Sequence, residues 1–195
     1  MKDYFRGVLK TINSSIEKMD ENAFEKLVDD SVSVLKNGGK LIATGLGKNV
    51  PICEKFVGTM LSLGLEAAFL HTNTAVHGDL GAVHDGDLVI VLSKSGETVE
   101  SLYLLEQLKK RDIIIWAMTF VSDSSLAMEA ENVLVMNLDN EGDRWDIVPN
   151  NSTTLNLIIL QGLVIMVADR IGVTLEDFKR NHPGGHIGEI LREKR

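Results

Sequence analysis

Hydroxyl groups and a glycine follow a strongly apolar segment within residues 87–100, DLVIVLSKSGETVE. Residues 88–92 are all apolar and three of them are β-branched, which is typical of a strand buried on both faces of a parallel sheet. Apolar residues then recur at helical spacing from residue 99 to residue 108, so a helix is expected to begin near Glu97. The unpaired amides and the dipole of that helix start would favour an anion such as phosphate.

The turn between this strand and this helix carries groups that a phosphate needs. The hydroxyls of Ser93, Ser95 and Thr98 can donate hydrogen bonds to phosphate oxygens, and Gly96 allows a close approach of the backbone. The alternative is that Ser95 simply caps the helix. The segment by itself leaves both interpretations open.

A second glycine-containing turn, residues 45–49 (GLGKN), follows the first predicted strand. It is not a Walker A loop, because Ile42 and Asn49 stand where that motif needs glycine and Ser or Thr. It is not a complete dinucleotide fingerprint either, because Val50 occupies the third glycine position. The backbone and Lys48 could contact a small polar ligand; the alternative is a tight turn with a solvated lysine.

Two histidines lie where they could do chemistry. His77 is two residues from Asp79, and such a pair could hold a metal, but the spacing does not supply three firm ligands. A loop held by a His–Asp hydrogen bond, or a contact with substrate, is the preferred interpretation. His182 precedes Pro183 and is either a proton carrier, because its ordinary pKa lies near neutral pH, or a surface histidine.

Composition restricts the class of protein. The formal net charge of −8 argues against a nucleic-acid partner, which would need a basic face. The single cysteine, Cys53, excludes an internal disulfide and a cysteine-based zinc site. The sequence shows no signal-peptide pattern and no apolar run of membrane length, so a cytoplasmic protein without a membrane partner is expected.

Strands and helices alternate along the chain. Two amphipathic helices are expected in residues 1–37 and an α/β core in residues 38–195, with no linker between them, so residues 1–195 are predicted to form a single domain. The predicted strands are 40–44, 66–70, 87–92, 113–119 and 132–137. The predicted core helices are 49–63, 97–109, 124–130, 151–171 and a short one that Thr174 caps and that ends before Pro183. This order predicts an open parallel five-stranded sheet with helices on both faces, a three-layer αβα arrangement.

Four polar loops leave the carboxyl ends of these strands: residues 45–48, 71–81, 93–96 and 141–154. Ligands of open parallel sheets bind beyond the carboxyl ends of the strands. The convergence of these loops on one edge therefore predicts a small-molecule site more strongly than any one motif does.

The motifs GLGKN, HGDLG, LSKSGETVE, VPNNSTTLNL and EDFKRNHPGG follow one another in this order. Together they resemble the sugar isomerase (SIS) domain of the arabinose-5-phosphate isomerases, and HGDLG combined with DF-x-x-x-HPGG is specific to that branch. The resemblance implies a phosphosugar isomerase that interconverts ribulose 5-phosphate and arabinose 5-phosphate. No CBS domains follow residue 195, so a stand-alone form is expected.

The resemblance also implies roles for individual residues. Proton transfer and ring opening are assigned to Glu100, Glu141 and His182, with Lys48 contacting the substrate and stabilising negative charge on oxygen. The implied contacts with phosphate and sugar are Gly45, Gly47, His77, Ser93, Ser95, Gly96, Thr98, Ser152 and Thr153. Which of the two glutamates is the base stays open. No metal or redox cofactor is expected, and a homo-oligomer (dimer or tetramer) with sites at subunit interfaces is implied.

Some positions depart from the family pattern. Residues 142–145 are Gly-Asp-Arg-Trp where the family has Ala-Cys-Pro after the glutamate, Asn49 and Asn150 replace a serine and a threonine, and Lys94 stands between the two serines. These changes put the identity of the sugar in question more than the type of reaction. Two other functions stay open: a 6-phospho-3-hexuloisomerase, against which the HPGG segment speaks, and a non-catalytic phosphosugar-binding module.

Overall fold

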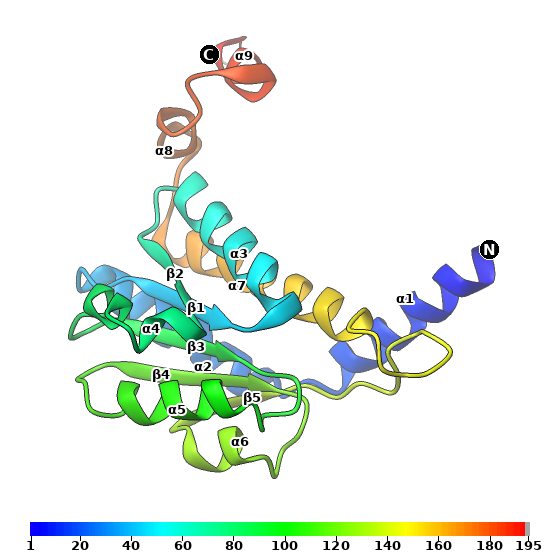
Figure 1. The fold of residues 1–195 in the computed structure, drawn as a ribbon. Helices are drawn as coiled ribbons and strands as arrows, with labels where there is room; N and C mark the ends of the chain where they lie inside the picture. Colours follow the sequence, from blue (N-terminus) through cyan, green and yellow to red (C-terminus); the bar gives the residue numbers. More distant parts are fainter. Residues whose placement is uncertain (194–195) are drawn as a thin grey trace.

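A computed structural model of the chain describes residues 1–193 and contains one open sheet of five parallel strands (Figure 1). The strands are β1 (Leu41–Gly45), β2 (Ala67–His71), β3 (Leu88–Leu92), β4 (Ile114–Thr119) and β5 (Asn132–Val135), in the spatial order β2-β1-β3-β4-β5. The parallel five-stranded α/β sheet expected from the sequence is thus confirmed. The pairing of Gly45 with Leu92, and of Leu92 with Met118, brings the carboxyl ends of β1, β3 and β4 to one edge.

Helices cover both faces of the sheet (Figure 1). One face carries α2 (Glu21–Lys36), α3 (Val50–Ser62) and α7 (Asn151–Ile171), against which α1 (Lys2–Glu17) packs; the other carries α4 (Thr72–Ala75), α5 (Val99–Leu108) and α6 (Ser125–Glu129). Because side chains of a strand alternate between faces, Leu88 and Ile90 of β3 enter the first core while Val89 and Val91 enter the second. The buried sheet therefore separates two apolar layers.

The sequence explains where several helices begin. The Asp20 side chain accepts hydrogen bonds from the amides of Asn22 and Ala23 and so caps α2. Thr174 and Asp177 form a reciprocal capping box at the start of α8 (Leu175–Arg180), as expected for a helix that Thr174 caps.

Three short elements were not predicted. The segment expected to be a loop between β2 and β3 contains α4 and a 3₁₀ turn, η2 (Asp79–Ala82), and the tail after Gly184 forms α9 (Gly185–Glu193). A single turn has too few residues to show helical periodicity, and α4 is instead stabilised by the His71 ring, which accepts a hydrogen bond from the amide of Asn73. A further 3₁₀ turn, η1 (Gly47–Asn49), lies within the lysine-containing turn after β1.

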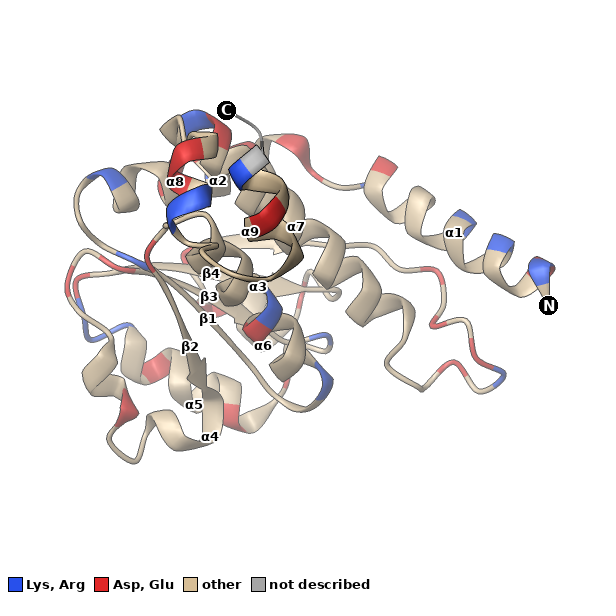
Figure 2. Cartoon of the chain, turned by 90° about the horizontal axis from the view of Figure 1, so that it is seen from above, with Lys and Arg blue, Asp and Glu red and all other residues tan. Residues whose placement is uncertain are grey.

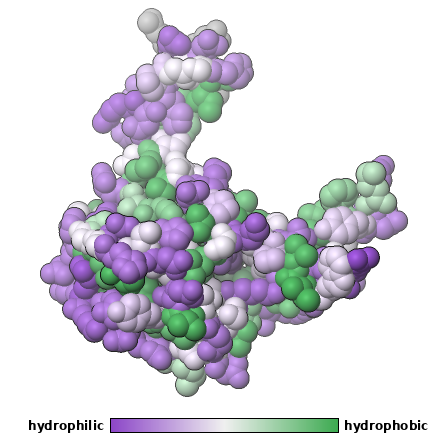
Figure 3. Space-filling model, in the orientation of Figure 1, coloured by the Kyte–Doolittle hydropathy of each residue, from purple (hydrophilic) through white to green (hydrophobic). Residues whose placement is uncertain are grey.

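Both ends of the chain extend away from the sheet. In Figure 1, α1 extends to one side, and α8 and α9 rise beyond the end of α3. The α1 arm shows green patches in Figure 3, and its exposed apolar side chains include Phe5 and Leu9. In Figure 2, acidic and basic residues are interspersed over the helices and loops.

Among the described residues, α7 is the one helix long and apolar enough to cross a membrane by length and composition, whereas the sequence was expected to contain no apolar run of membrane length. In the fold it packs against α1, α2 and α3 and buries Leu155, Leu160 and Val164 in the core. We therefore interpret α7 as the central helix of its layer.

Candidate functional site

A cavity of about 280 Å³ opens at the carboxyl edge of the sheet, where the turns after β1 and β3 meet the start of α7. Most of the residues that line it are of polar type; they are Leu46, Lys48, Asn49, Leu92, Ser93, Lys94, Ser95, Thr98, Pro149, Ser152 and Thr153. We call it the phosphate cavity, after the ligand that the sequence predicts for it. Six of these residues are site residues expected from the sequence, and the fold brings them together: Lys48, Ser93, Ser95, Thr98, Ser152 and Thr153.

The turn after β3 is held by its own hydroxyls. Ser93 Oγ accepts a hydrogen bond from the amide of Gly96 (3.2 Å) and shares one with Thr98 Oγ1 (3.0 Å). Ser95 Oγ accepts from the amide of Glu97 (3.2 Å), so the N-cap residue of α5 is Thr98 rather than Ser95. Thr98 makes no side-chain capping bond within the described part of the chain, which leaves the amides of the first turn of α5 available to an anion.

Gly96 and Glu97 attach this turn to α6. Gly96 has a φ of +67°, and its carbonyl accepts a hydrogen bond from the amide of Leu126 (3.0 Å). The Glu97 carboxylate accepts bonds from the amide (2.6 Å) and hydroxyl (2.8 Å) of Ser125, and these bonds lower its pKa. The acidic side chain of the turn is thereby held against the start of α6.

Glu141 occupies the start of α7. Its side chain is 1% exposed, and Oε2 accepts hydrogen bonds from the amides of Asn150 (3.0 Å) and Ser152 (2.9 Å). Oε1 accepts from Ser152 Oγ (2.6 Å) and pairs with Lys94 Nζ (2.6 Å). Burial alone would raise the pKa of Glu141, but these bonds outweigh it and lower the pKa, so the carboxylate is ionised and caps α7.

The lysine turn after β1 is tightly built. Gly47 has a φ of +58°, and a Cβ on Gly45 would come closer than 3.0 Å to the Cβ of Asn49, so glycine is required at both positions. The Asn49 side chain accepts from Asn156 Nδ2 (3.0 Å) and donates to the carbonyl of Leu92 (3.5 Å). This joins the turn to α7 and β3, while the exposed Lys48 lines the phosphate cavity.

Glu100 and His77 line a different cavity of about 340 Å³, between α4 and the start of α5. Both side chains are exposed, and Tyr103 and Thr72 are among their neighbours there. Thr98 lines the phosphate cavity and Glu100, two residues later, lines the other cavity, so the start of α5 contributes to the walls of both. The fold thus groups Glu100 with His77, and Glu141 with Lys94 and Ser152.

His182 lies apart from both cavities within one chain. Its Nε2 bonds to Ser62 Oγ (2.9 Å), its Nδ1 to the carbonyl of Phe178 (2.8 Å), and its ring stacks on Phe178 with centroids 3.9 Å apart. Ser62 is the last residue of α3, whereas Lys48 precedes the first. A helix of 13 residues is about 20 Å long, so a chain cannot bring its own His182 to its own phosphate cavity in this conformation.

A profile of a known protein family, the SIS domain, matches residues 34–167. The chain belongs to the SIS domain family. This SIS protein is 32% identical over 193 residues to "Arabinose 5-phosphate isomerase KdsD" of Pseudomonas aeruginosa, covering 97% of this chain and 59% of that protein. It is 33% identical over 174 residues to "Arabinose 5-phosphate isomerase GutQ" of Escherichia coli K12, covering 87% of this chain and 54% of that protein. The chain therefore spans little more than half the length of these relatives.

A solved structure is similar over nearly the whole SIS chain. The structure of E. coli CFT073 c3406 in complex with arabinose 5-phosphate superposes with a TM-score of 0.86 at 31% identity, covering 93% of this chain and 95% of that one. The overall fold described above is therefore shared with a protein whose structure was solved in complex with a ligand.

Within residues 1–193, no group of three His, Cys, Asp or Glu side chains is placed to hold a metal ion. Cys53 is buried on α3, and burial raises the pKa of its thiol to about 12, so it stays protonated.

Sequence reasoning missed the ion pair between Lys94 and Glu141 and a further cavity beside it. That cavity, of about 390 Å³, is lined by Lys94, Ser95, Phe120, Val121, Leu138, Asp139, Asn140, Glu141 and Asp146. We call it the adjoining cavity. The only indication in the sequence is that Lys94 departs from the family pattern. Because the contact joins two loops far apart in the sequence, no local pattern predicts it.

Proposed function

We propose that this SIS protein is a phosphosugar isomerase that interconverts an aldose and a ketose phosphate, with ribulose 5-phosphate and arabinose 5-phosphate as the preferred pair. The observation that carries the proposal is the uncapped start of α5, which faces a polar cavity also bounded by Lys48 and by Lys94, the partner of Glu141. The relatives named arabinose 5-phosphate isomerase and the c3406 complex with arabinose 5-phosphate support this choice of sugar.

The phosphate of the sugar binds at the start of α5. The first-turn amides and the helix dipole attract the dianion, and the hydroxyls of Ser93, Ser95 and Thr98 donate further hydrogen bonds. Gly96 supplies the positive φ of the turn that presents Ser95, and Lys48 adds a positive charge to the lining of the cavity. Ser152 and Thr153 complete the wall at the start of α7.

The reaction moves a proton between C1 and C2 of the sugar through an enediol, so it needs a base that can return the proton. Glu141 is a weak base in this conformation, because four hydrogen-bond donors stabilise its ionised form. Glu100 is exposed and stands near His77, without a capping role at α7. We therefore assign the proton transfer at carbon to Glu100, the orientation of the site to Glu141, and the stabilisation of negative charge on oxygen to Lys48.

The active form is proposed to be a homo-oligomer in which His182 acts in the site of another copy. His182 sits on an arm that leads away from its own phosphate cavity, and the α1 arm exposes apolar side chains such as Phe5 and Leu9. In the partner's site, the imidazole would carry protons to and from hydroxyl oxygens during ring opening.

Proton NMR in D₂O with a panel of pentose and hexose phosphates tests this function. We expect the C1 or C2 proton of arabinose 5-phosphate or ribulose 5-phosphate to exchange with solvent as the other sugar forms. Exchange on a hexulose phosphate alone would instead identify the hexuloisomerase alternative, and no exchange with any sugar would overturn the isomerase proposal.

Glu100→Gln and Glu141→Gln should test the base assignment in the same assay. We expect Glu100→Gln to fold and bind phosphosugar but to lose turnover by more than about 100-fold, because it removes the base. Turnover by Glu100→Gln within about tenfold of wild type, roughly 1.4 kcal/mol of barrier, would contradict the assignment.

A non-catalytic phosphosugar-binding module is the second candidate. The observation that favours it is the engagement of Glu141 as a helix cap, because a buried carboxylate can be retained for structure alone. Saturable phosphosugar binding by calorimetry, without proton exchange at carbon, would select this candidate.

A further inference from the structure

Lys94 stands between a buried carboxylate and the space in which a ligand anion would lie. Its Nζ is 2.6 Å from Oε1 of Glu141, and its side chain lines both the phosphate cavity and the adjoining cavity. A phosphate in the phosphate cavity would therefore compete with Glu141 for the same ammonium group.

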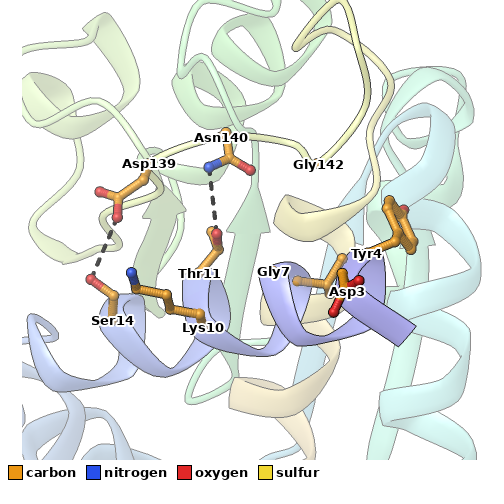
Figure 4. Close-up of a pocket in the computed structure, with 10 residues that line it drawn as sticks. Asp3, Tyr4, Gly7, Lys10, Thr11, Ser14, Asp139, Asn140 and Gly142 are labelled. Atoms are coloured by element: carbon orange, nitrogen blue, oxygen red, sulfur yellow. Dashed lines mark hydrogen bonds between the residues drawn. The ribbon is translucent and has the colours of Figure 1, made fainter. Parts of the chain in front are cut away.

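The Glu141 side of this pair is fixed. Its carboxylate is held by the amides of Asn150 and Ser152 at the start of α7. The loop that carries it is braced against α1, where Asn140 donates to Thr11 Oγ1 (3.4 Å) and Ser14 donates to Asp139 (3.5 Å), as Figure 4 shows. Glu141 therefore keeps its position whether or not Lys94 contacts it.

The main chain of Lys94 is fixed, but its side chain can move. The Lys94 carbonyl accepts hydrogen bonds from the amide of Phe120 (3.1 Å) and from Thr119 Oγ1 (3.2 Å), which fixes the main chain. The side chain is 44% exposed, whereas that of Glu141 is 1% exposed. The flexible four-carbon stem of a lysine lets its charge swing about such a fixed point.

We propose that Lys94 is a shared cation that leaves Glu141 to bind the phosphate of the ligand, so that Glu141 holds phosphate affinity below what the site could reach. This rests on the proposed function, because it requires the phosphate to occupy the phosphate cavity. A phosphate dianion attracts an ammonium more strongly than a single carboxylate charge does at equal distance. After Lys94 leaves, Glu141 still accepts bonds from two amides and the Ser152 hydroxyl and stays satisfied.

A double-mutant cycle with Lys94→Met and Glu141→Gln tests the proposal, with inorganic phosphate as the probe in isothermal titration calorimetry. We expect Lys94→Met to bind phosphate about tenfold more weakly and Glu141→Gln about tenfold more tightly, each about 1.4 kcal/mol. In the double variant, the gain from Glu141→Gln should disappear because no lysine is left to be released. The matched control is Lys109→Met, which breaks the exposed pair with Glu129 at the far end of α5 and should leave affinity unchanged.

The sign of the coupling decides between this proposal and simple repulsion of the anion by Glu141. If Glu141 acted only by repulsion, its neutralisation would tighten binding at least as much in the Lys94→Met background as in wild type, and that result would overturn the proposal. A looser rather than tighter Glu141→Gln variant would also overturn it. A crystal structure of the wild-type protein with phosphate needs no variant: Lys94 Nζ should contact a phosphate oxygen, and Lys94 still paired to Glu141 would refute the proposal.

The experiments distinguish failure of the isomerase proposal from failure of the proposed role of Lys94. The titrations use inorganic phosphate and do not depend on turnover. If Lys94→Met and Glu141→Gln are coupled in phosphate affinity but the protein turns over no sugar, the isomerase proposal is wrong and the role of Lys94 stands. Turnover without coupling would remove the role of Lys94 alone, and a wild-type protein that neither binds phosphate nor exchanges the proton of any sugar would overturn both.

Discussion

Gly96→Ala is expected to be among the most damaging single-methyl changes in this protein. Gly96 has a φ of +67°, and an added Cβ would come closer than 3.0 Å to the Cβ and Oγ of Ser124 and within 3.1 Å of Thr119 Oγ1. Ser124 is the N-cap of α6, and its Oγ donates to the carbonyl of Val121 (2.8 Å), so it cannot simply turn away.

The expected cost has two parts. A left-handed conformation costs an L residue about 1–2 kcal/mol, and forcing an extra carbon into a packed site costs about 1–3 kcal/mol. The free energy of unfolding should therefore fall by about 2–5 kcal/mol. Because the same turn presents Ser95 and the start of α5, phosphate affinity should fall as well.

Urea unfolding followed by circular dichroism measures the first effect, and calorimetric titration with phosphate measures the second. Gly38→Ala is the matched control, since Gly38 also has a positive φ of +84° but no atom within 4 Å of an added Cβ. It should cost only the conformational part, about 1–2 kcal/mol. The double variant Gly96→Ala/Ser124→Gly should recover most of the steric part, because glycine is tolerated at an N-cap at a cost of a few tenths of a kcal/mol.

If Gly96→Ala and Gly38→Ala lower the free energy of unfolding equally, this reasoning is refuted, because the contact with Ser124 would then contribute nothing. Failure of Ser124→Gly to restore stability to Gly96→Ala, while Ser124→Gly alone is mild, would also show that the strain lies elsewhere.

Two further changes separate stability from binding. Asp87 is buried and accepts bonds from Lys40 Nζ (2.6 Å) and from the amides of Lys40 and His84. Burial opposes ionisation, but these bonds outweigh it and lower the pKa of Asp87. Its stabilisation is therefore complete above the unfolded pKa, about 3.9, and is lost as the pH falls through the folded pKa. In acid titrations of unfolding free energy, Asp87→Asn should be less stable than wild type at neutral pH and should lose less stability below about pH 4; equal slopes would contradict this. Ser95→Ala should weaken phosphate binding about tenfold while changing the free energy of unfolding by less than about 1 kcal/mol, and unchanged affinity by calorimetry would exclude Ser95 from the phosphate contacts.

Much of the fold could be predicted because its signals are local. An unbroken apolar run such as Leu88–Leu92 marks a doubly buried strand, and the alternation of such runs with amphipathic helices predicts the parallel sheet. The meeting of the turns after β1 and β3 follows from the same topology, since parallel strands end on one edge. The single-domain boundaries 1–195 and the cytoplasmic location stay predictions.

The rest depends on contacts between distant segments. The helix α9 begins at the second of two glycines and has only three apolar residues, Ile187, Ile190 and Leu191, so its hydrophobic pattern is too short to predict a helix from the sequence. The pairing of Lys94 with Glu141, and the commitment of Glu97 to α6, are set by how loops meet in three dimensions. Likewise, nothing local to His182 indicates that it rests on the far end of α3.

Two helix starts meet at the phosphate cavity, and they differ in one respect that limits what can bind there. The start of α7 already holds a carboxylate that belongs to the chain, whereas the start of α5 makes no such bond within the described residues. The protein has thus filled one of two adjacent anion positions itself. If a phosphate binds at the start of α5 as proposed, a second anionic group placed toward the start of α7 would be repelled by Glu141, and we expect such ligands to bind less tightly.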